Sequence, residues 1–202
     1  MKWRVTVMRD AGFGAFAASF SEMWPLLAQG LGDTLKLASG AVLIGLIFGL
    51  VVCLARISPN KILSRAALLY IEAMRGTPAL VQLLLIYYGL VSMGLRLEAF
   101  QAAVLGLGFN MAAYVAEILR GGLAGVGTGQ KEAAAALGLT PSMSMRLIIL
   151  PQAIRIVLPP LGNSAISLIK DTSIAALISA PDLVLQARNL SSEYFLPLPI
   201  FL

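Results

Sequence analysis

The stretch LASGAVLIGLIFGLVVCL, from Leu37 to Leu54, contains no charged residue. An α-helix rises by about 1.5 Å per residue, so a run of this length matches the ~30 Å apolar core of a bilayer. The whole chain has the same character, because 58% of its 202 residues are hydrophobic and 12% are charged. Soluble domains carry about 25% charged residues, so the composition favours a membrane protein.

Further apolar runs follow this first span. The second, Ala66 to Leu95, is too long for one straight crossing and is interrupted by RGTP at Arg75–Pro78. The third is expected over Ala99–Leu119 and the fourth over Ile156–Ala180. A fifth begins at Tyr194, but the sequence stops at Leu202, short of the ~20 residues that a span needs. We therefore predict an all-α integral membrane protein with about five transmembrane helices, the fifth cut short. Residues 1–36 form a partly interfacial N-terminal segment and 37–202 the transmembrane domain.

The basic residues lie in the connections between apolar runs and not in one cluster, which favours a topology signal over a nucleic-acid surface. The connection after the first span carries Arg56, Lys61 and Arg65, and the one after the third carries Arg120, Lys131, Arg146 and Arg155. Cytoplasmic connections are enriched in Lys and Arg. Both connections are therefore predicted to face the cytoplasm, which places the N-terminus outside. The apolar runs between the connections are predicted to lie in the lipid bilayer.

The second basic connection contains GQKEAAAALGLTPSMSMRLIILP, residues 129–151. Alanine has the highest helix propensity, so Lys131–Leu137 is predicted to be helical. Gly138 is typical of a helix C-terminus, whereas Thr140 and Pro141 are typical of an N-cap and a first helical residue. The second helix is expected to run to Leu150 and to stop at Pro151. From these residues alone, an amphipathic helix on the membrane surface is the simplest interpretation.

This connection also matches a known pattern. Seven residues fit the spacing EAA-x3-G-x9-I-x-LP: Glu132, Ala133, Ala134, Gly138, Ile148, Leu150 and Pro151. With RGTPALVQLLLIYYGL, NMAAYVAEILRGG and LPQAIRIVLPPLGNSAISLIKDTSIAALI, it makes the chain resemble permeases of binding-protein-dependent ABC importers, in their polar amino acid branch. The resemblance covers Arg75–Ile178, about half of the chain.

The resemblance implies a type I ABC importer transmembrane fold and a permease subunit in the bacterial inner membrane. It implies that the 129–151 loop is a coupling helix, whose Glu132, Ala133, Ala134 and Gly138 contact a cytoplasmic ATPase dimer. It further implies a second, identical or homologous permease subunit and an extracytoplasmic amino acid binding protein. The chain has no GxxxxGK[ST] phosphate loop, so ATP and Mg are expected on the ATPase, with no cofactor or metal in this chain.

Polar residues inside the spans indicate either helix–helix hydrogen bonds or a solute pathway. In the fourth span these are Asn163, Ser167, Lys170, Asp171 and Thr172, and in the third span Glu117. We favour a pathway for Lys170 and Asp171, because a carboxylate and an ammonium complement the two charges of an amino acid. Glu117 has an equally simple interpretation, as an interfacial charge paired with Arg120.

Gly76, Thr77 and Pro78 are predicted to kink the second span. Proline frees a backbone carbonyl that lipid does not satisfy, so the kink is expected to face protein or a cavity. The sequence leaves a hinge and a fixed packing bend equally open, and allows Glu72 to pair with Arg75.

Three other classes of protein are considered. The chain has no His, the commonest general base, which disfavours a membrane hydrolase. A stand-alone channel or secondary carrier for a small polar solute is the main alternative, and the coupling pattern disfavours it. A scaffold subunit fits the charged fourth span poorly.

Overall fold

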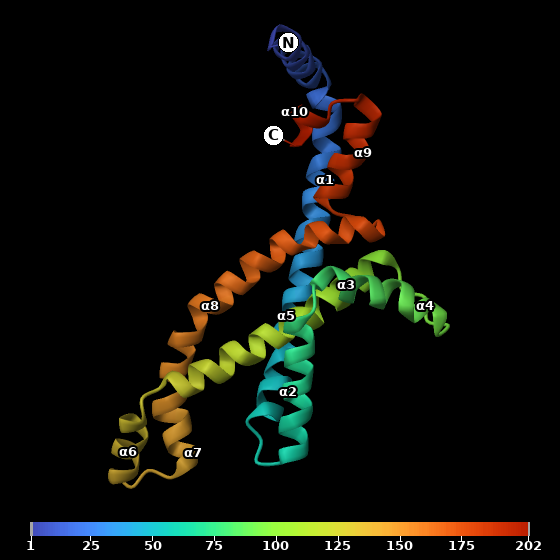
Figure 1. The fold of residues 1–202 in the computed structure, drawn as a ribbon. Helices are drawn as coiled ribbons and strands as arrows, with labels where there is room; N and C mark the ends of the chain where they lie inside the picture. Colours follow the sequence, from blue (N-terminus) through green and yellow to red (C-terminus); the bar gives the residue numbers. More distant parts are fainter. Residues whose placement is uncertain (1, 202) are drawn as a thin grey trace.

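The computed structural model describes residues 2–201, and every regular element in that part is helical (Figure 1). Helix α1 (Lys2–Arg56) runs the length of the molecule and contains Pro25. It passes without a break through residues 36 and 37, where the sequence suggested a boundary between an N-terminal segment and the first span. No proline lies between Pro25 and Arg56, so no residue there lacks the N–H that a continuous helix needs.

The predicted interruption of the second apolar run is confirmed. Helix α2 (Lys61–Gly76) ends at the RGTP sequence and is followed by α3 (Ala79–Leu84), a π-helical turn η1 (Leu85–Gly89) and the short α4 (Leu90–Ser92). The chain bends by 107° at this break. The third run forms α5 (Ala99–Gly125), which extends six residues beyond the predicted end at Leu119.

The coupling region forms α6 (Thr128–Ala136) and α7 (Pro141–Ser144), with a π-helical turn η2 (Met145–Ile149) after them. Helix α8 (Leu150–Asp171) follows directly, then a 3₁₀ segment η3 (Thr172–Ile178). The prediction that Pro151 stops the second helix is wrong. Pro151 lies in the first turn of α8, where a missing N–H and a φ near −65° are tolerated. Residues 141–178 therefore form one apolar helical segment.

The last helices do not form a fifth span within the described residues. Helix α9 (Leu183–Tyr194) ends where that span was expected to begin, and α10 (Pro197–Phe201) is five residues long. Among residues 2–201, three segments are long and apolar enough to cross a membrane, or four if the bent pair counts as one span: Ser19–Arg56, Ala99–Gly125, Pro141–Ile178, and Lys61–Gly76 with Ala79–Ser92.

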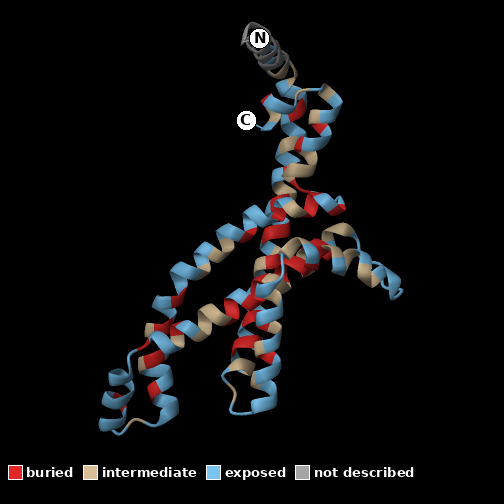
Figure 2. Ribbon diagram, in the orientation of Figure 1, coloured by how far each residue is buried: buried red, intermediate tan, exposed pale blue. Residues whose placement is uncertain are grey.

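The core lies where α1, α5, α3 and η3 meet, and buried residues gather there in Figure 2. Helices α1 and α5 approach closely because glycines face larger side chains. Gly45 and Gly49 of α1 contact Met111 and Val115, and Gly108 of α5 contacts Ile44. Small residues allow helix backbones to approach in this way inside a membrane.

Helix α9 packs along the N-terminal half of α1 (Figure 1). Its Leu183 N–H donates to Thr34 Oγ1 of α1 over 2.9 Å, and Asp182 caps α9 by accepting from Leu185 N–H over 2.7 Å. Asp182 is almost completely buried, and burial raises the pKa of its carboxyl group although the backbone hydrogen bonds act in the opposite direction. The hydrogen bond between Leu183 and Thr34 therefore fastens α9 to α1.

Both basic connections lie at one end of the molecule. The α1–α2 connection and the α6–α7 hairpin are together at the lower end of Figure 1, far from the N-terminal turns of α1. The charge pattern predicted this arrangement, because positively charged connections share the cytoplasmic side.

Candidate solute cavity and coupling hairpin

The turn between α6 and α7 has the local structure that the sequence predicted. Gly138 has a φ of +73°, in the left-handed region that glycine adopts without strain. Its N–H donates to Ala135 O over 2.9 Å and Leu139 N–H donates to Ala134 O over 3.0 Å, which is the Schellman arrangement. Thr140 then caps α7 by accepting from Met143 N–H over 3.3 Å. The hairpin is therefore a fixed turn between two helices.

One face of α6 is exposed and the other packs against the chain. Glu132, Ala133 and Gly138 are exposed, and Leu137 keeps 78% of its surface. Ala134 is 2% exposed and lies on the inner face. The structure thus separates the four residues that the family pattern assigned to an ATPase contact. Three of them are available to a partner, whereas Ala134 packs α6 against its own chain.

The hairpin is joined firmly to α8. Val126, Ile149 and Ala153 form a small core with Leu123 of α5. Gln152 of α8 donates through Nε2 to Gln130 Oε1 of α6 over 3.1 Å and to Ile148 O over 2.9 Å. Ile148, Leu150 and Pro151, the last residues of the family pattern, lie in η2 and the first turn of α8 and not in the loop. The hairpin is therefore linked to α8 by the Gln130–Gln152 hydrogen bond and by the continuous helical segment through α7 and η2.

The break at Gly76–Pro78 is held by side-chain amides. Pro78 has no N–H, so Met74 O, four residues earlier, loses its helical donor. Two amides replace it, with Gln82 Nε2 at 2.9 Å and Asn110 Nδ2 of α5 at 3.1 Å. Gln82 Nε2 also donates to Thr77 Oγ1 over 2.7 Å, and Asn110 Nδ2 to Gln82 Oε1 over 3.0 Å. The kink faces protein, as predicted, and these bonds brace it.

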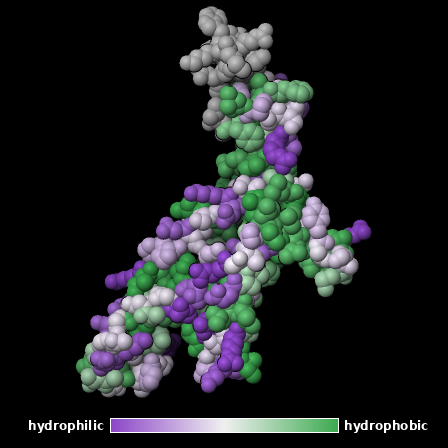
Figure 3. Space-filling model, viewed as in Figure 1, coloured by the Kyte–Doolittle hydropathy of each residue, from purple (hydrophilic) through white to green (hydrophobic). Residues whose placement is uncertain are grey.

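A cavity of about 550 Å³ opens between this break, α5 and α8. Its walls come from three parts of the chain that are far apart in the sequence, which the fold brings together. The residues that line it are Arg75, Gly76, Thr77, Pro78, Ala79, Asn110, Met111, Tyr114, Ser164, Ser167, Leu168 and Asp171. In Figure 3, hydrophilic side chains gather between the lower limbs of the molecule, while apolar side chains cover most of the central region.

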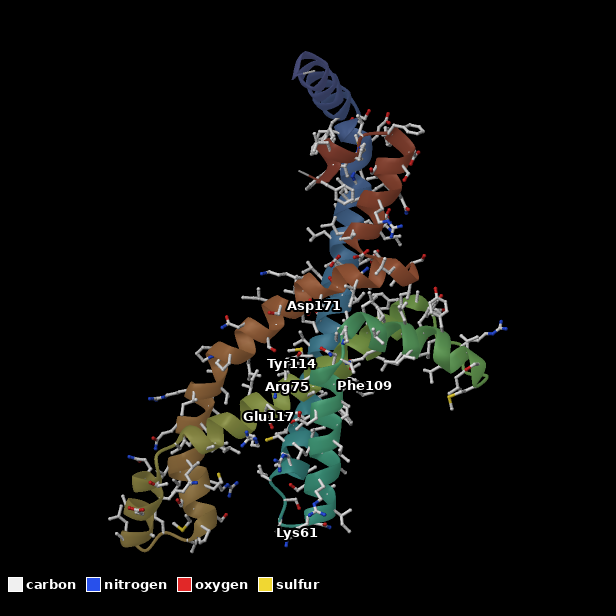
Figure 4. The ribbon with its side chains drawn as sticks, viewed as in Figure 1. Lys61, Arg75, Phe109, Tyr114, Glu117 and Asp171 are labelled. Carbon is white, nitrogen blue, oxygen red and sulfur yellow. The ribbon has the colours of Figure 1, made fainter. Side chains whose placement is uncertain are left out.

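The cavity holds one cation and one carboxylate on different walls. Arg75 lies over the ring of Tyr114, 5.5 Å from its centroid, in a cation–π contact that replaces the predicted pairing with Glu72. Asp171 comes from the end of α8 (Figure 4). Among the described residues, neither Arg75 nor Asp171 takes part in an ion pair. Both groups can therefore bind a charged solute.

The structure brings only some of the predicted pathway residues to this cavity. Ser167, Asp171, Gly76, Thr77 and Pro78 line it. Asn163 and Lys170 are exposed on other faces of α8 and do not line it. Residues 170 and 171 point about 100° apart on a helix, and Asp171 is the one of the two that lines the cavity.

Thr172 and Glu117 also lie elsewhere. Thr172 is 2% exposed and donates to Ile169 O over 2.7 Å, which makes it part of the turn into η3. Glu117 accepts two hydrogen bonds from Arg120, over 3.0 and 2.9 Å, on the same face of α5. The simpler interpretation of Glu117, an ion pair with its neighbour, describes its geometry.

Two important residues were missed in the sequence. Tyr114 lies within NMAAYVAEILRGG, which carries part of the family resemblance, and Gln82 is a lone amide in the run ALVQLLL. Gln82 carried a usable signal, because it lies four residues after Pro78 and a buried amide needs acceptors. Tyr114 had none, since its partner Arg75 is 39 positions away.

The fold and the two sites define a class of protein. A helical membrane subunit has a polar cavity between its spans and an exposed helical hairpin that continues into α8, one of the helices that line the cavity. This is the architecture of a membrane transport subunit that is driven from one side.

Comparison with known proteins gives the family. Residues 41–200 match the family described as "Binding-protein-dependent transport system inner membrane component", and the chain belongs to it. It is 43% identical over 174 residues to the "Probable amino-acid ABC transporter permease protein YckA" of Bacillus subtilis, covering 86% of this chain and 77% of that protein. It is 39% identical over 187 residues to the "Glutamine transport system permease protein GlnP" of Escherichia coli K12, covering 90% and 85%.

A solved structure agrees with these relatives. The chain superposes with a TM-score of 0.88 and 44% identity on the structure titled "Crystal structure of an amino acid ABC transporter with histidines", covering 91% of this chain and 86% of that one. The predicted fold class and the identification as an ABC importer permease are thereby confirmed, and the protein is a multi-pass membrane transport subunit.

Proposed function

We propose that this chain is the permease subunit of an ATP-driven importer that carries polar amino acids across the bacterial cytoplasmic membrane. One observation carries the proposal. The helical segment that begins at Pro141 in the hairpin continues through α8 and ends with Ser164, Ser167 and Asp171 on the cavity wall. The part of the chain that a driving partner can reach is thus continuous with the part that a solute can reach.

The cavity suits a zwitterion. The carboxylate of an amino acid is a partner for the Arg75 guanidinium, and its ammonium is a partner for Asp171, since charge-assisted hydrogen bonds are the strongest of their kind. Ser164, Ser167 and Asn110 add neutral donors and acceptors for a polar side chain. In this proposal Arg75 replaces Lys170 as the cationic member of the site.

The partners follow from the same geometry and from the family. The exposed face of α6, with Glu132 and Ala133, is the surface for a cytoplasmic ATPase dimer that holds ATP and Mg. Helix α8 buries only Ala153, Val157 and Leu168, so its exposed apolar side chains favour a second permease subunit across the pathway. The family is described as binding-protein-dependent, which supports an extracytoplasmic binding protein as the partner that delivers the amino acid.

The test is uptake by the complete importer in liposomes. We expect Gly138→Asp to reduce ATP-dependent uptake of a labelled polar amino acid, because the left-handed φ of this position costs an L-residue about 1–2 kcal/mol. A cost of that size corresponds to roughly a tenfold loss. Gly129→Asp adds the same charge to the same hairpin at a position with free space and no positive φ, and it should transport normally.

Two outcomes would contradict the proposal. Full ATP-dependent uptake by Gly138→Asp, at normal protein levels in the membrane, would show that the hairpin does not couple the two subunits. Uptake by the purified chain without any ATPase would favour a stand-alone carrier.

A further inference from the structure

A second cavity, of about 410 Å³, lies at the end of the molecule that carries the basic connections. It is separate from the solute cavity and shares no lining residue with it. Three cations from three elements line it: Arg56 at the end of α1, Arg120 of α5 and Lys131 of α6. The remaining wall is apolar and includes Ile57, Leu123 and Ile149.

The charges in this cavity are only partly compensated. Arg120 is paired with Glu117 over 2.9 Å. Within residues 2–201, neither Arg56 nor Lys131 is in an ion pair. Arg56 and Lys131 therefore have no carboxylate within ion-pair distance among the described residues.

Arg56 is held in place with a polar group unsatisfied. Its Nη1 donates to Ser64 Oγ over 2.9 Å, and Ser64 Oγ donates back to Arg56 O over 2.8 Å. Its Nε is buried and has no hydrogen-bond partner among the described residues. Arg56 is half-buried, and a guanidinium with a buried N–H left unsatisfied is costly, so an anion in the cavity would stabilise this arrangement.

The position of the cavity selects the kind of anion. It lies beside the exposed apolar side chains of Ile57 and Met145, which are 47% and 41% exposed, at the end of membrane-spanning helices. A ligand here meets cations on one side and apolar surface on the other. Anionic phospholipids have this combination, and basic pockets between helices on the cytoplasmic side bind their headgroups.

We propose that this cavity binds the phosphate of an anionic phospholipid, with Arg56 and Lys131 as its cationic ligands and Ile57 against an acyl chain. The bound lipid connects the end of α1 to the α6 hairpin. This site is independent of the proposed amino acid cargo, because none of its residues lines the solute cavity.

The test is native mass spectrometry of the full chain in detergent, titrated with phosphatidylglycerol or with phosphatidylcholine of the same chain length. We expect phosphatidylglycerol to be retained preferentially. Lys131→Gln and Arg56→Gln should each weaken its binding about fivefold, the effect of one cation near an anionic surface. Lys131 lies on the exposed surface of α6, so its variant avoids any disturbance of the Arg56–Ser64 contact.

Lys61→Gln and Arg65→Gln are the matched controls. They remove the same charge from α2, at the same end of the molecule, and neither residue lines the cavity (Figure 4 marks Lys61). Retention equal to the unchanged chain is expected for both. If they weaken binding as much as Lys131→Gln, or if phosphatidylcholine binds equally well, the assigned site is wrong.

A final arm separates the two sources of phosphate. The titration is repeated in excess inorganic phosphate. Phosphatidylglycerol binding that survives supports a lipid site, in which the acyl contacts contribute. Complete displacement, with the loss again confined to the Lys131 and Arg56 variants, would overturn the lipid and leave a site for free phosphate.

Discussion

Pro78 and Pro151 both stand in long apolar runs, yet the chain bends by 107° near one and continues as a helix through the other. At Pro78 the preceding residue, Thr77, is extended, with φ −118° and ψ 146°. At Pro151 the preceding residue, Leu150, is helical, with φ −61° and ψ −44°. Proline biases its predecessor away from the helical region, so the bend is the ordinary result and the continuous helix needs a cause.

The two sites differ in what happens to the backbone carbonyl four residues before the proline, and this difference explains the two outcomes. Ahead of Pro151 the chain forms the π turn η2, in which Leu150 N–H donates to Met145 O, five residues earlier. The wider turn makes room for the proline ring next to the carbonyl four residues before it. At Pro78, the free carbonyl oxygen of Met74 instead accepts hydrogen bonds from the side chains of Gln82 and Asn110. Tertiary hydrogen bonds fix a bend at the cavity, and a local π turn keeps the helix from the hairpin into α8 continuous.

The largest effect on stability is expected where α8 packs against α5. A Cβ at Gly122 of α5 would overlap Val157 Cγ1 of α8 and lie 3.3 Å from Ala153 O. Because valine has little rotamer freedom in a helix, the two helices must separate. We expect Gly122→Ala to destabilise the protein by about 1–3 kcal/mol, measured by unfolding in mixed micelles. Gly121→Ala, with no atom within 4 Å, is the control and should be neutral. Equal stabilities would mean that α8 is not packed on α5 at this position.

The next prediction compares the amides at the two sites. Gln82→Leu removes a buried donor at the break and leaves Thr77 Oγ1 and the backbone carbonyls with fewer partners. An unsatisfied buried group costs about 1–3 kcal/mol. Gln152→Leu removes a more accessible amide from α8, and we expect a smaller loss, below about 1 kcal/mol. A double-mutant cycle of Gln82 with Asn110 would show coupling if both brace the bend. Equal losses of stability in the Gln82 and Gln152 variants would mean that side-chain amides support the bend at Pro78 no more than they support α8.

The smallest effects should have opposite signs. Pro78→Ala gives up a residue whose φ of −61° suits an extended position, so stability should fall by about 0.4–1 kcal/mol. Pro151→Ala allows the helix to relax from its π turn, so stability should rise by a similar, small amount. Thermal unfolding of the two variants side by side measures both. A loss of stability in both would mean that Pro151 is as well placed as Pro78.

The parts of this structure that the sequence predicted are local ones. Gly138, Thr140 and Pro141 specify the hairpin turn through their own backbone preferences, and RGTP specifies the break. The long apolar runs predicted the spans because lipid requires helices of a given length. The assignment of the hairpin to an ATPase remains a prediction that the family supports.

The parts that the sequence did not reveal depend on distant contacts. Pro151 alone suggests a helix end, because nothing in its neighbourhood announces the π turn before it. Arg75 was matched to Glu72, three residues away, whereas it lies over Tyr114 of another helix. Lys170 and Asp171 are adjacent and share one prediction, but the register of α8 directs only Asp171 to the cavity. In the last two cases the packing against α5 decides.

Helix α1 is much longer than the hydrocarbon core of a membrane is thick. Its 55 residues span about 80 Å, whereas about 30 Å crosses the hydrocarbon. The Asp33–Lys36 ion pair, with Lys36 72% exposed, lies one turn before the uncharged run that starts at Leu37. We therefore expect α1 to leave the hydrocarbon core near these charges and to extend beyond it. The hydrogen bond from Leu183 N–H to Thr34 Oγ1 lies at the same level, so it fastens α9 to the part of α1 that precedes the uncharged run.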